Sequence, residues 1–243
     1  MTHKTKGIVL RTVKYGETSL IVTIFTELFG VQSYMVNGVR TASKSNKKAN
    51  CFLPGAILDL VVYHSEQKNL QRIKEFQWAY LYQHNFSDVI KNCIVLYMVE
   101  LLNKCLKQPE ENHNLFNFCE DVLKELDTAE RSVTANIPLY YTLQLTHFLG
   151  FKMIDNYSKE NSFLDLQEGC FETTQPDHNN FIDGEQAFTT SQILKVLLPF
   201  ELEQIKLSRD ARRNLLLQYQ NYYALHIAEF GQLKTLTVLH EVL

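Results

Sequence analysis

Apolar and polar residues alternate with a period of two along the first eighty residues of the chain. Runs of β-branched and aromatic residues, of which 19–25 is the densest, are separated by turn residues such as Gly30 and Asn37-Gly38. A period of two is typical of strands, and Asn-Gly is a strong turn signal. The pattern predicts five strands, near residues 8–13, 19–25, 31–36, 56–63 and 69–76. Five short strands suit a small Greek-key barrel, and an SH3-like barrel fits the pattern equally well.

Beyond residue 80 the apolar residues follow helical spacing. Helices are predicted from Ser87-Asp88 to about Lys107, over 115–126, 139–149, 193–198 and 208–230, and over 236–243. Gly150 is placed to end the third of these helices, and residues 189–192 have capping-box spacing before the fourth. Residues from about 155 to 188, rich in Gly, Asn and Asp, interrupt the helices as an irregular or hairpin insertion. We therefore expect an α+β protein of two domains, a barrel in 1–80 and a helical domain in 81–243.

The first seventy residues are basic, whereas the rest of the chain is acidic. Residues 1–70 hold nine Lys and Arg against four Asp and Glu, a balance of +5. The whole chain carries −3, so the remaining residues carry −8. A concentrated positive field attracts polyanions, of which the nucleic-acid backbone is the commonest, although a solvated lysine-rich surface has the same composition.

Other bulk features are those of a globular intracellular protein. With 243 residues, of which 45% are hydrophobic and 21% charged, the chain can bury one large core or two modest ones. No apolar run approaches the ~20 residues that span a bilayer, and the first residues lack the layout of a signal peptide. Five scattered cysteines indicate reduced thiols. We expect a cytoplasmic protein with no membrane partner.

A cationic loop is predicted between the third and fourth strands, because residues 40–48 are polar, basic and almost free of apolar side chains. Cations follow phosphates while aromatic rings stack on unpaired bases, which is the usual layout for single-strand binding. The candidate DNA-binding residues, on this loop and on neighbouring strands, are Arg11, Lys14, Tyr34, Arg40, Lys44, Lys47 and Lys48. The alternatives are a solubilising loop and, for Tyr34, a half-buried strand tyrosine.

The motifs of common enzyme classes are missing. The sequence has no glycine-rich phosphate loop, no G-x-S-x-G elbow and no H-E-x-x-H. Cys170 and His178 give two ligands, too few for a tetrahedral structural zinc site. His226, among aromatic residues, is typical of a packed or hydrogen-bonded histidine. We therefore predict a binding protein without catalytic residues, metal or cofactor.

Several blocks resemble the RecO family of bacterial recombination mediators. In the barrel part they are residues 7–11 (Gly-Ile-Val-Leu-Arg), 15–18 (Tyr-Gly-Glu-Thr), 25–26, Gly30 and 38–40 (Gly-Val-Arg). In the helical part, residues 100–102, 149–151 and 233–239 are similar to that family's second domain, with looser matches. The resemblance thus runs along nearly the whole chain.

This resemblance implies an OB-fold first domain and a helical second domain, without nucleotide hydrolysis. It implies binding of single- and double-stranded DNA in the nucleoid, annealing of complementary strands, and assistance in loading recombinase on single-stranded DNA. The partners it implies are RecR, the single-strand-binding protein and the recombinase RecA. Arg11 and Arg40 match the family's basic strand residues, and Lys44 and Lys47 lie in the matching loop. An RNA-binding OB-fold protein and a non-catalytic protein-interaction adaptor are the alternative functions.

Two further expectations concern the helical part. Many family members hold a four-cysteine zinc module there, whereas the corresponding segment of this chain, about 155–188, has Cys170 alone, which predicts an insertion without metal. Arg209, Arg212 and Arg213 share one helix face, and an apolar stripe at Leu216, Tyr219 and Tyr223 follows them. This face is a hypothetical binding site for the acidic, apolar-ended tail of the single-strand-binding protein. Pairing of these arginines with acids of the same body is the alternative.

Overall fold

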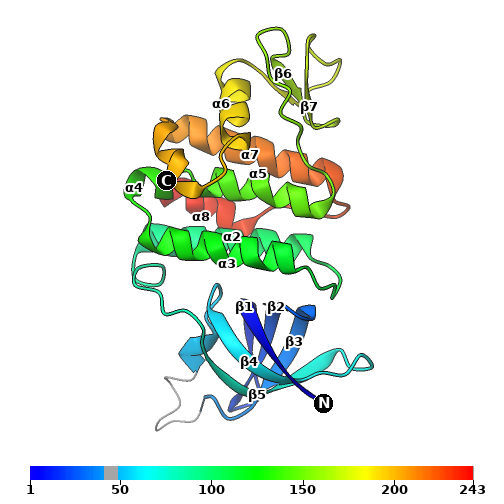
Figure 1. Ribbon diagram of the computed structural model, residues 1–243, viewed down its shortest axis with the longest axis vertical. Helices are drawn as coiled ribbons and strands as arrows, with labels where there is room; N and C mark the ends of the chain where they lie inside the picture. Colours follow the sequence, from blue (N-terminus) through cyan, green and yellow to red (C-terminus); the bar gives the residue numbers. More distant parts are fainter. Residues whose placement is uncertain (41–48, 243) are drawn as a thin grey trace. The chain divides into compact units, whose positions relative to one another are not determined.

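The computed structural model describes residues 1–40 and 49–242 of the chain (Figure 1). Two compact units are formed, one from residues 1–83 with 102–124 and the other from residues 84–101 with 125–243. The first unit is built on a β-barrel and the second is largely helical, which confirms the predicted fold class. Among the described residues, no helix has the length and apolarity needed to cross a membrane.

The barrel consists of five strands in the closed order β1-β2-β3-β5-β4. Their bounds are β1 Thr2–Tyr15, β2 Ser19–Thr26, β3 Gly30–Val36, β4 Ile57–Tyr63 and β5 Leu70–Trp78. Neighbouring strands are antiparallel except β3 and β5, which pair in parallel over residues 33–35 and 70–72. All five predicted strands are present, and the closed five-stranded barrel is an OB fold.

Every second residue along a strand points into the barrel, and these side chains fill its interior. Val9, Val22, Ile24 and Leu60 are at most 2% exposed. Gly7 fits among them because it has no side chain: a Cβ there would lie 2.5 Å from Cγ2 of Ile24. Burial of this apolar set is the main force that holds the barrel closed.

The helical segment 102–124 packs on the barrel within the first unit. Glu120, which is 5% exposed, accepts hydrogen bonds from the barrel's Lys6 at 3.0 Å and pairs with Lys124 at 2.6 Å. Phe116 packs on Phe25, with ring centroids 5.6 Å apart. Because of these contacts, residues 102–124 belong to the same compact unit as the barrel.

The helices are α2 Val89–Cys105, α3 His113–Thr128, α4 Arg131–Thr134, α5 Ile137–Leu149, α6 Gly184–Leu194, α7 Arg209–His226 and α8 Lys234–Val242, with 3-10 turns η1 at Asn50–Phe52 and η2 at Pro199–Gln204. Gly150 ends α5 in the left-handed conformation, as predicted, and Ser208 caps α7 by accepting a hydrogen bond from the N–H of Ala211. The predicted helix over 193–198 is wrong. Residues 189–192 lie inside α6, and the chain has left the helix by Val196.

The segment 155–188 contains a three-stranded sheet of order β7-β6-β8, in addition to irregular chain. Its strands are β6 Phe163–Asp165, β7 Cys170–Glu172 and β8 Phe181–Ile182. Asp165 ties the segment together by accepting from the N–H of Gln167 and by a 3.1 Å contact with Nε2 of His178. No group of three His, Cys, Asp or Glu suited to a metal ion occurs in the part of the chain that the structure describes.

Candidate nucleic-acid interface

The pleat of β1 separates its two candidate cations. Arg11 pairs with Thr23 and points outward, and it is exposed. Lys14 is three positions further on, so it lies on the opposite pleat, where its partner is the buried Leu20. Lys14 is nevertheless exposed, because it stands near the end of the strand. Both cations are open to solvent, on different faces of one strand.

Arg40 is bound to the turn between β1 and β2. Its backbone N–H donates to the carbonyl of Thr18 at 3.1 Å, and its guanidinium donates to the carbonyl of Gly16 at 3.1 Å. The start of the predicted cationic loop is therefore anchored at the hairpin that carries Lys14. The other three candidates, Lys44, Lys47 and Lys48, lie outside the described residues.

Tyr34 is a core residue, which corrects the prediction that it serves as a stacking platform. It is 0% exposed, and its register partners Val22 and Gln71 are also buried. Burial raises the pKa of its hydroxyl, as expected for a phenol inside a barrel. A ring without an exposed face cannot stack on a base.

The outward-facing positions next to Tyr34 form a belt that crosses the strands. Its paired residues, one from each strand, are Val13, Ile21, Met35, Arg72 and Tyr63. Tyr63 is 47% exposed and Arg72 is also exposed. Neither residue was predicted from the sequence, although the alternation of β4 and β5 was visible. The missing information was the parallel pairing of β3 with β5, which no local pattern encodes.

One part of this belt is hollowed. A groove of about 640 Å³ lies between the ends of β3 and β4 and the start of β5, and its walls include Met35, Tyr63, Lys68, Leu70 and Arg72. No Asp or Glu is among its described lining residues. The groove thus combines an aromatic ring, apolar atoms and two cations.

The loop between β4 and β5 is held in place by Gln71. This buried amide accepts from the N–H of Ser65 at 3.0 Å and donates to the carbonyls of Ser65 and Lys68 at 2.8 and 2.6 Å. The neighbouring His64 stacks on Phe29, with ring centroids 4.0 Å apart, and burial lowers the pKa of this imidazole. One wall of the groove is therefore fixed by side-chain contacts.

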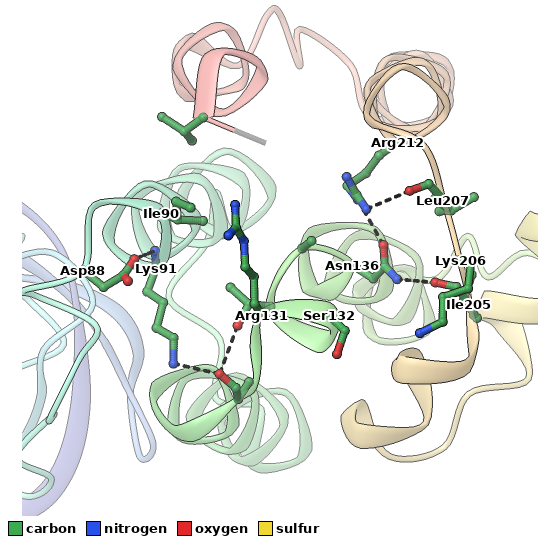
Figure 2. Close-up of a pocket in the computed structure, with 14 residues that line it drawn as sticks. Asp88, Ile90, Lys91, Arg131, Ser132, Asn136, Ile205, Lys206, Leu207 and Arg212 are labelled. Atoms are coloured by element: carbon green, nitrogen blue, oxygen red, sulfur yellow. Dashed lines mark hydrogen bonds between the residues drawn. The ribbon is translucent and has the colours of Figure 1, made fainter.

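A second hollow, of about 790 Å³, lies within the helical unit (Figure 2). Its lining comes from the start of α2 and the residue before it, the chain around α4, the link from η2 to α7, Arg212 of α7 and Val242 of α8. The charged side chains in it are Lys91, Arg131, Lys206, Arg212 and a single acid, Asp88. Its apolar lining includes Ile90, Ile205 and Leu207. This pocket combines a positive charge excess with apolar walls.

Arg212 is built into the wall of this pocket. Its Nε donates to Oδ1 of the buried Asn136 at 3.1 Å, and its terminal nitrogen donates to the carbonyl of Leu207 at 3.2 Å (Figure 2). Asn136 in turn donates to the carbonyl of Ile205 at 2.8 Å. Burial lowers the pKa of Arg212, but a guanidinium stays charged at neutral pH. Lys91 is similarly occupied, since it donates to the carbonyls of Asp127 and Ala129.

The other two arginines of the predicted face hold the end of α8. Arg209 donates to the carbonyl of Glu241 and Arg213 to that of His240. Cations at these last carbonyls satisfy orphan acceptors and complement the helix dipole. Leu216, Tyr219 and Tyr223 are at most 1% exposed, so the apolar stripe expected beside the arginines belongs to the core.

His226 and Cys170 have structural surroundings. Nε2 of His226 lies 3.1 Å from the carbonyl of Leu166, and its ring stacks on Phe151 with centroids 5.3 Å apart. The Cys170 thiol donates to Glu172, and its pKa is raised to about 11 by burial and by nearby carboxylates. Neither residue has the surroundings of a base or of a reactive thiolate.

A closed five-stranded barrel with exposed cations, followed by a helical unit, defines the class of two-domain OB-fold proteins. Family models for the N-terminal and C-terminal parts of recombination protein O match residues 1–82 and 87–236. DNA repair protein RecO of Flavobacterium psychrophilum is 34% identical over 244 residues, and that of Phocaeicola vulgatus is 32% identical over 243 residues. Each alignment covers 100% of this chain and 99% of the relative. The chain belongs to the RecO family of DNA repair and recombination proteins.

Proposed function

We propose that this protein is a non-catalytic recombination mediator whose barrel binds DNA. The observation that carries the proposal is the gathering of Lys14 and Arg40 at the β1–β2 hairpin, at the start of the lysine-rich segment 41–48, with Arg11 exposed on the same strand. Phosphates bind such a surface without regard to sequence, and their neutralisation releases counterions. Lys44, Lys47 and Lys48 extend the cationic set in the chain beyond Arg40.

In this proposal the protein anneals complementary strands and assists the loading of the recombinase RecA on single-stranded DNA. Its partners are single- and double-stranded DNA, RecR, the single-strand-binding protein and RecA, and it acts in the cytoplasm at the nucleoid. Membership of the RecO family and full-length similarity to proteins named for DNA repair support this assignment.

The helical unit supplies the second contact of the proposal. The acidic tail of the single-strand-binding protein is assigned to the pocket around Arg212. Arg209 and Arg213 support it indirectly, because they hold the end of α8, whose Val242 lines the pocket. Four cations against one acid favour an anionic peptide, and the apolar walls suit a hydrophobic end residue. Lys206 and Arg131, which form no ion pair among the described residues, are the side chains most free to meet carboxylates.

A salt-dependent titration tests DNA binding. Labelled single-stranded DNA, duplex DNA and RNA of matched length are titrated with the wild type and with an Arg11→Ala, Arg40→Ala variant at several salt concentrations. Each lost phosphate contact lowers the slope of log K against log salt by about one. Unchanged affinity and slope in the variant remove this surface from the proposal. Tighter binding of RNA than of DNA favours an RNA-binding protein, and absence of binding to any nucleic acid favours an adaptor.

A further inference from the structure

The groove on the barrel offers more than phosphate contacts. Its aromatic side chain, Tyr63, is 47% exposed at the end of β4, and the groove lies directly beside this ring. Tyr63 stands opposite Arg72 in the β4–β5 register, and Arg72 stands opposite Met35 in the β3–β5 register. Neighbouring strands are about 4.8 Å apart, so these three side chains follow one another across the barrel surface.

The charges of the groove favour one class of ligand. Arg72 and Lys68 are exposed, and neither forms an ion pair with a carboxylate in the described part of the chain. The groove has no acid of its own among the described residues. Met35 and Leu70 add apolar surface beside the ring. A ligand that fits has a flat apolar face and a negative charge on either side of it, which is the chemistry of an unpaired nucleotide within a strand.

The groove is also preorganised, because contacts within the barrel unit already order one of its walls. Gln71 fixes the loop that carries Lys68, and the stack of His64 on Phe29 fixes the start of the same loop. A site whose wall is already ordered loses less conformational entropy when it binds. Its volume of about 640 Å³ lies within the range of about 300–1,000 Å³ that is usual for ligand pockets.

We propose that this groove is a base-stacking subsite for single-stranded DNA, in which an unpaired base lies on Tyr63 and its flanking phosphates meet Arg72 and Lys68. The inference rests on the proposed DNA binding and deepens it. It moves the stacking role from the buried Tyr34 to an exposed ring on another strand. A duplex has no free base faces, so this subsite distinguishes single strands from duplexes, whereas Arg11 and Arg40 contact any phosphate backbone.

The test compares bases with phosphates. An oligothymidine and an abasic oligonucleotide of equal length carry the same phosphates, and each is titrated with wild type, Tyr63→Ala, Tyr63→Phe and Arg72→Ala. Loss of one stacked base weakens binding by about five- to a hundredfold. We expect that loss for Tyr63→Ala with oligothymidine, and a change below about twofold with the abasic strand. Tyr63→Phe keeps the ring and should bind as the wild type does, and Phe200→Ala, an exposed ring removed from the helical unit, serves as the matched control.

Further readouts separate the possible results. Arg72→Ala should weaken both oligonucleotides and lower the salt slope by about one. A 2-aminopurine in place of one thymine should lose fluorescence on binding to the wild type but not to Tyr63→Ala. An RNA oligonucleotide in the same series shows whether the subsite also accepts ribose. Equal loss with the intact and abasic strands, or no loss with either while the wild type binds DNA, overturns the stacking subsite alone. Failure of the wild type to bind any strand overturns the proposed function itself.

Discussion

The carboxylate of Glu100 accepts two hydrogen bonds from Thr235, one from its backbone N–H at 2.8 Å and one from its hydroxyl at 2.6 Å. It also accepts from the N–H of Lys234 at 3.0 Å. A residue of α2 therefore caps the first turn of α8, while Arg209 and Arg213 bind the carbonyls of its last turn. The nine-residue α8 is too short to be stable alone. The carboxylate at its N-terminus and the arginines at its C-terminus complement the helix dipole and stabilise it.

Replacing Glu100 with Ala should lower the free energy of unfolding by about 1–2 kcal/mol, because two backbone N–H groups lose their acceptor. Urea unfolding of the purified variant measures this change. Glu125→Ala, which removes an exposed carboxylate from α3, is the control and should change stability by less than about 0.5 kcal/mol. Equal stability of Glu100→Ala and the control would mean that α8 does not depend on this cap.

The sequence predicted the β-barrel and most helices because their signals are local. Alternation identified all five strands, and Gly150 and Ser208 marked helix ends. The helix predicted over 193–198 failed because Thr189 and Ser191, typical cap residues, are here buried inside α6. The Thr190 hydroxyl lies 2.9 Å from the Tyr219 hydroxyl of α7, and the Ser191 hydroxyl donates to Asp155. Local capping preference was overridden by these tertiary contacts.

The candidate site was less predictable. Tyr34 and Tyr63 both stand in strands with alternating patterns, and only the barrel register shows that the first faces inward and the second outward. The arginines of α7 were predicted to form a free basic face, because their tertiary partners could not be seen in the sequence. Their partners are backbone carbonyls of α8 and the amide of Asn136, groups that carry no sequence signature.

Acid should destabilise the barrel unit through Glu120. Burial raises the pKa of this carboxyl, but hydrogen bonds from Lys124 and Lys6 outweigh burial and hold the pKa below its ordinary value. A depressed folded pKa means that the stabilisation is present above the unfolded value of about 4.3 and is lost as pH falls through the folded value. Glu120→Gln should therefore cost about 1–3 kcal/mol at neutral pH, where partial exposure of both lysines limits the loss. The cost should be smaller in acid, because the wild-type carboxyl then loses its own stabilising charge.

Urea unfolding at neutral pH and near pH 3.5 checks this expectation, with the second condition placed below the unfolded pKa of about 4.3. Glu75→Gln is the control, because Glu75 is paired with Lys74 on the surface and both side chains are well exposed. A Glu120→Gln variant with the same pH dependence as the wild type would show that this ion cluster does not govern acid stability.

Two glycines with nearly the same positive φ should respond differently to alanine. Gly16 has φ of 56° and Gly30 has φ of 59°. A Cβ on Gly16 would have no neighbour within 4 Å, whereas one on Gly30 would lie 2.2 Å from the carbonyl oxygen of Glu110. Gly16→Ala should cost only the left-handed strain, about 1–2 kcal/mol. Gly30→Ala should cost clearly more, because backbone must also move.

Thermal and urea unfolding of the two variants give the comparison directly. Both variants place a Cβ at nearly the same positive φ, so the difference between them reports the close approach of β3 to the chain at Glu110. Similar losses for Gly16→Ala and Gly30→Ala would contradict that approach.

The pocket around Arg212 should bind an acidic peptide with an apolar end more tightly than a neutral one. Arg131 and Lys206 are exposed and carry no structural hydrogen bond among the described residues, so Arg131→Ala, Lys206→Ala should fold normally. Contact between a carboxylate and such a cation contributes roughly 0.2–1 kcal/mol when exposed, and more when apolar walls exclude water. We expect a loss of about threefold to thirtyfold for the double variant, which corresponds to roughly 0.7–2 kcal/mol.

The measurement is a fluorescence titration with a labelled tail peptide of the single-strand-binding protein, its acid-to-amide version, and a version that lacks the apolar end. Arg212→Glu, Arg213→Glu should abolish binding, but it also breaks the contacts to Asn136 and to the end of α8, so its stability must be measured beside it. Lys159→Ala, an exposed cation of the segment before β6, is the matched control. If the wild type binds the acidic and amide peptides equally, charge does not select the ligand. If the double variant binds as the wild type does, the peptide lies elsewhere on the helical unit.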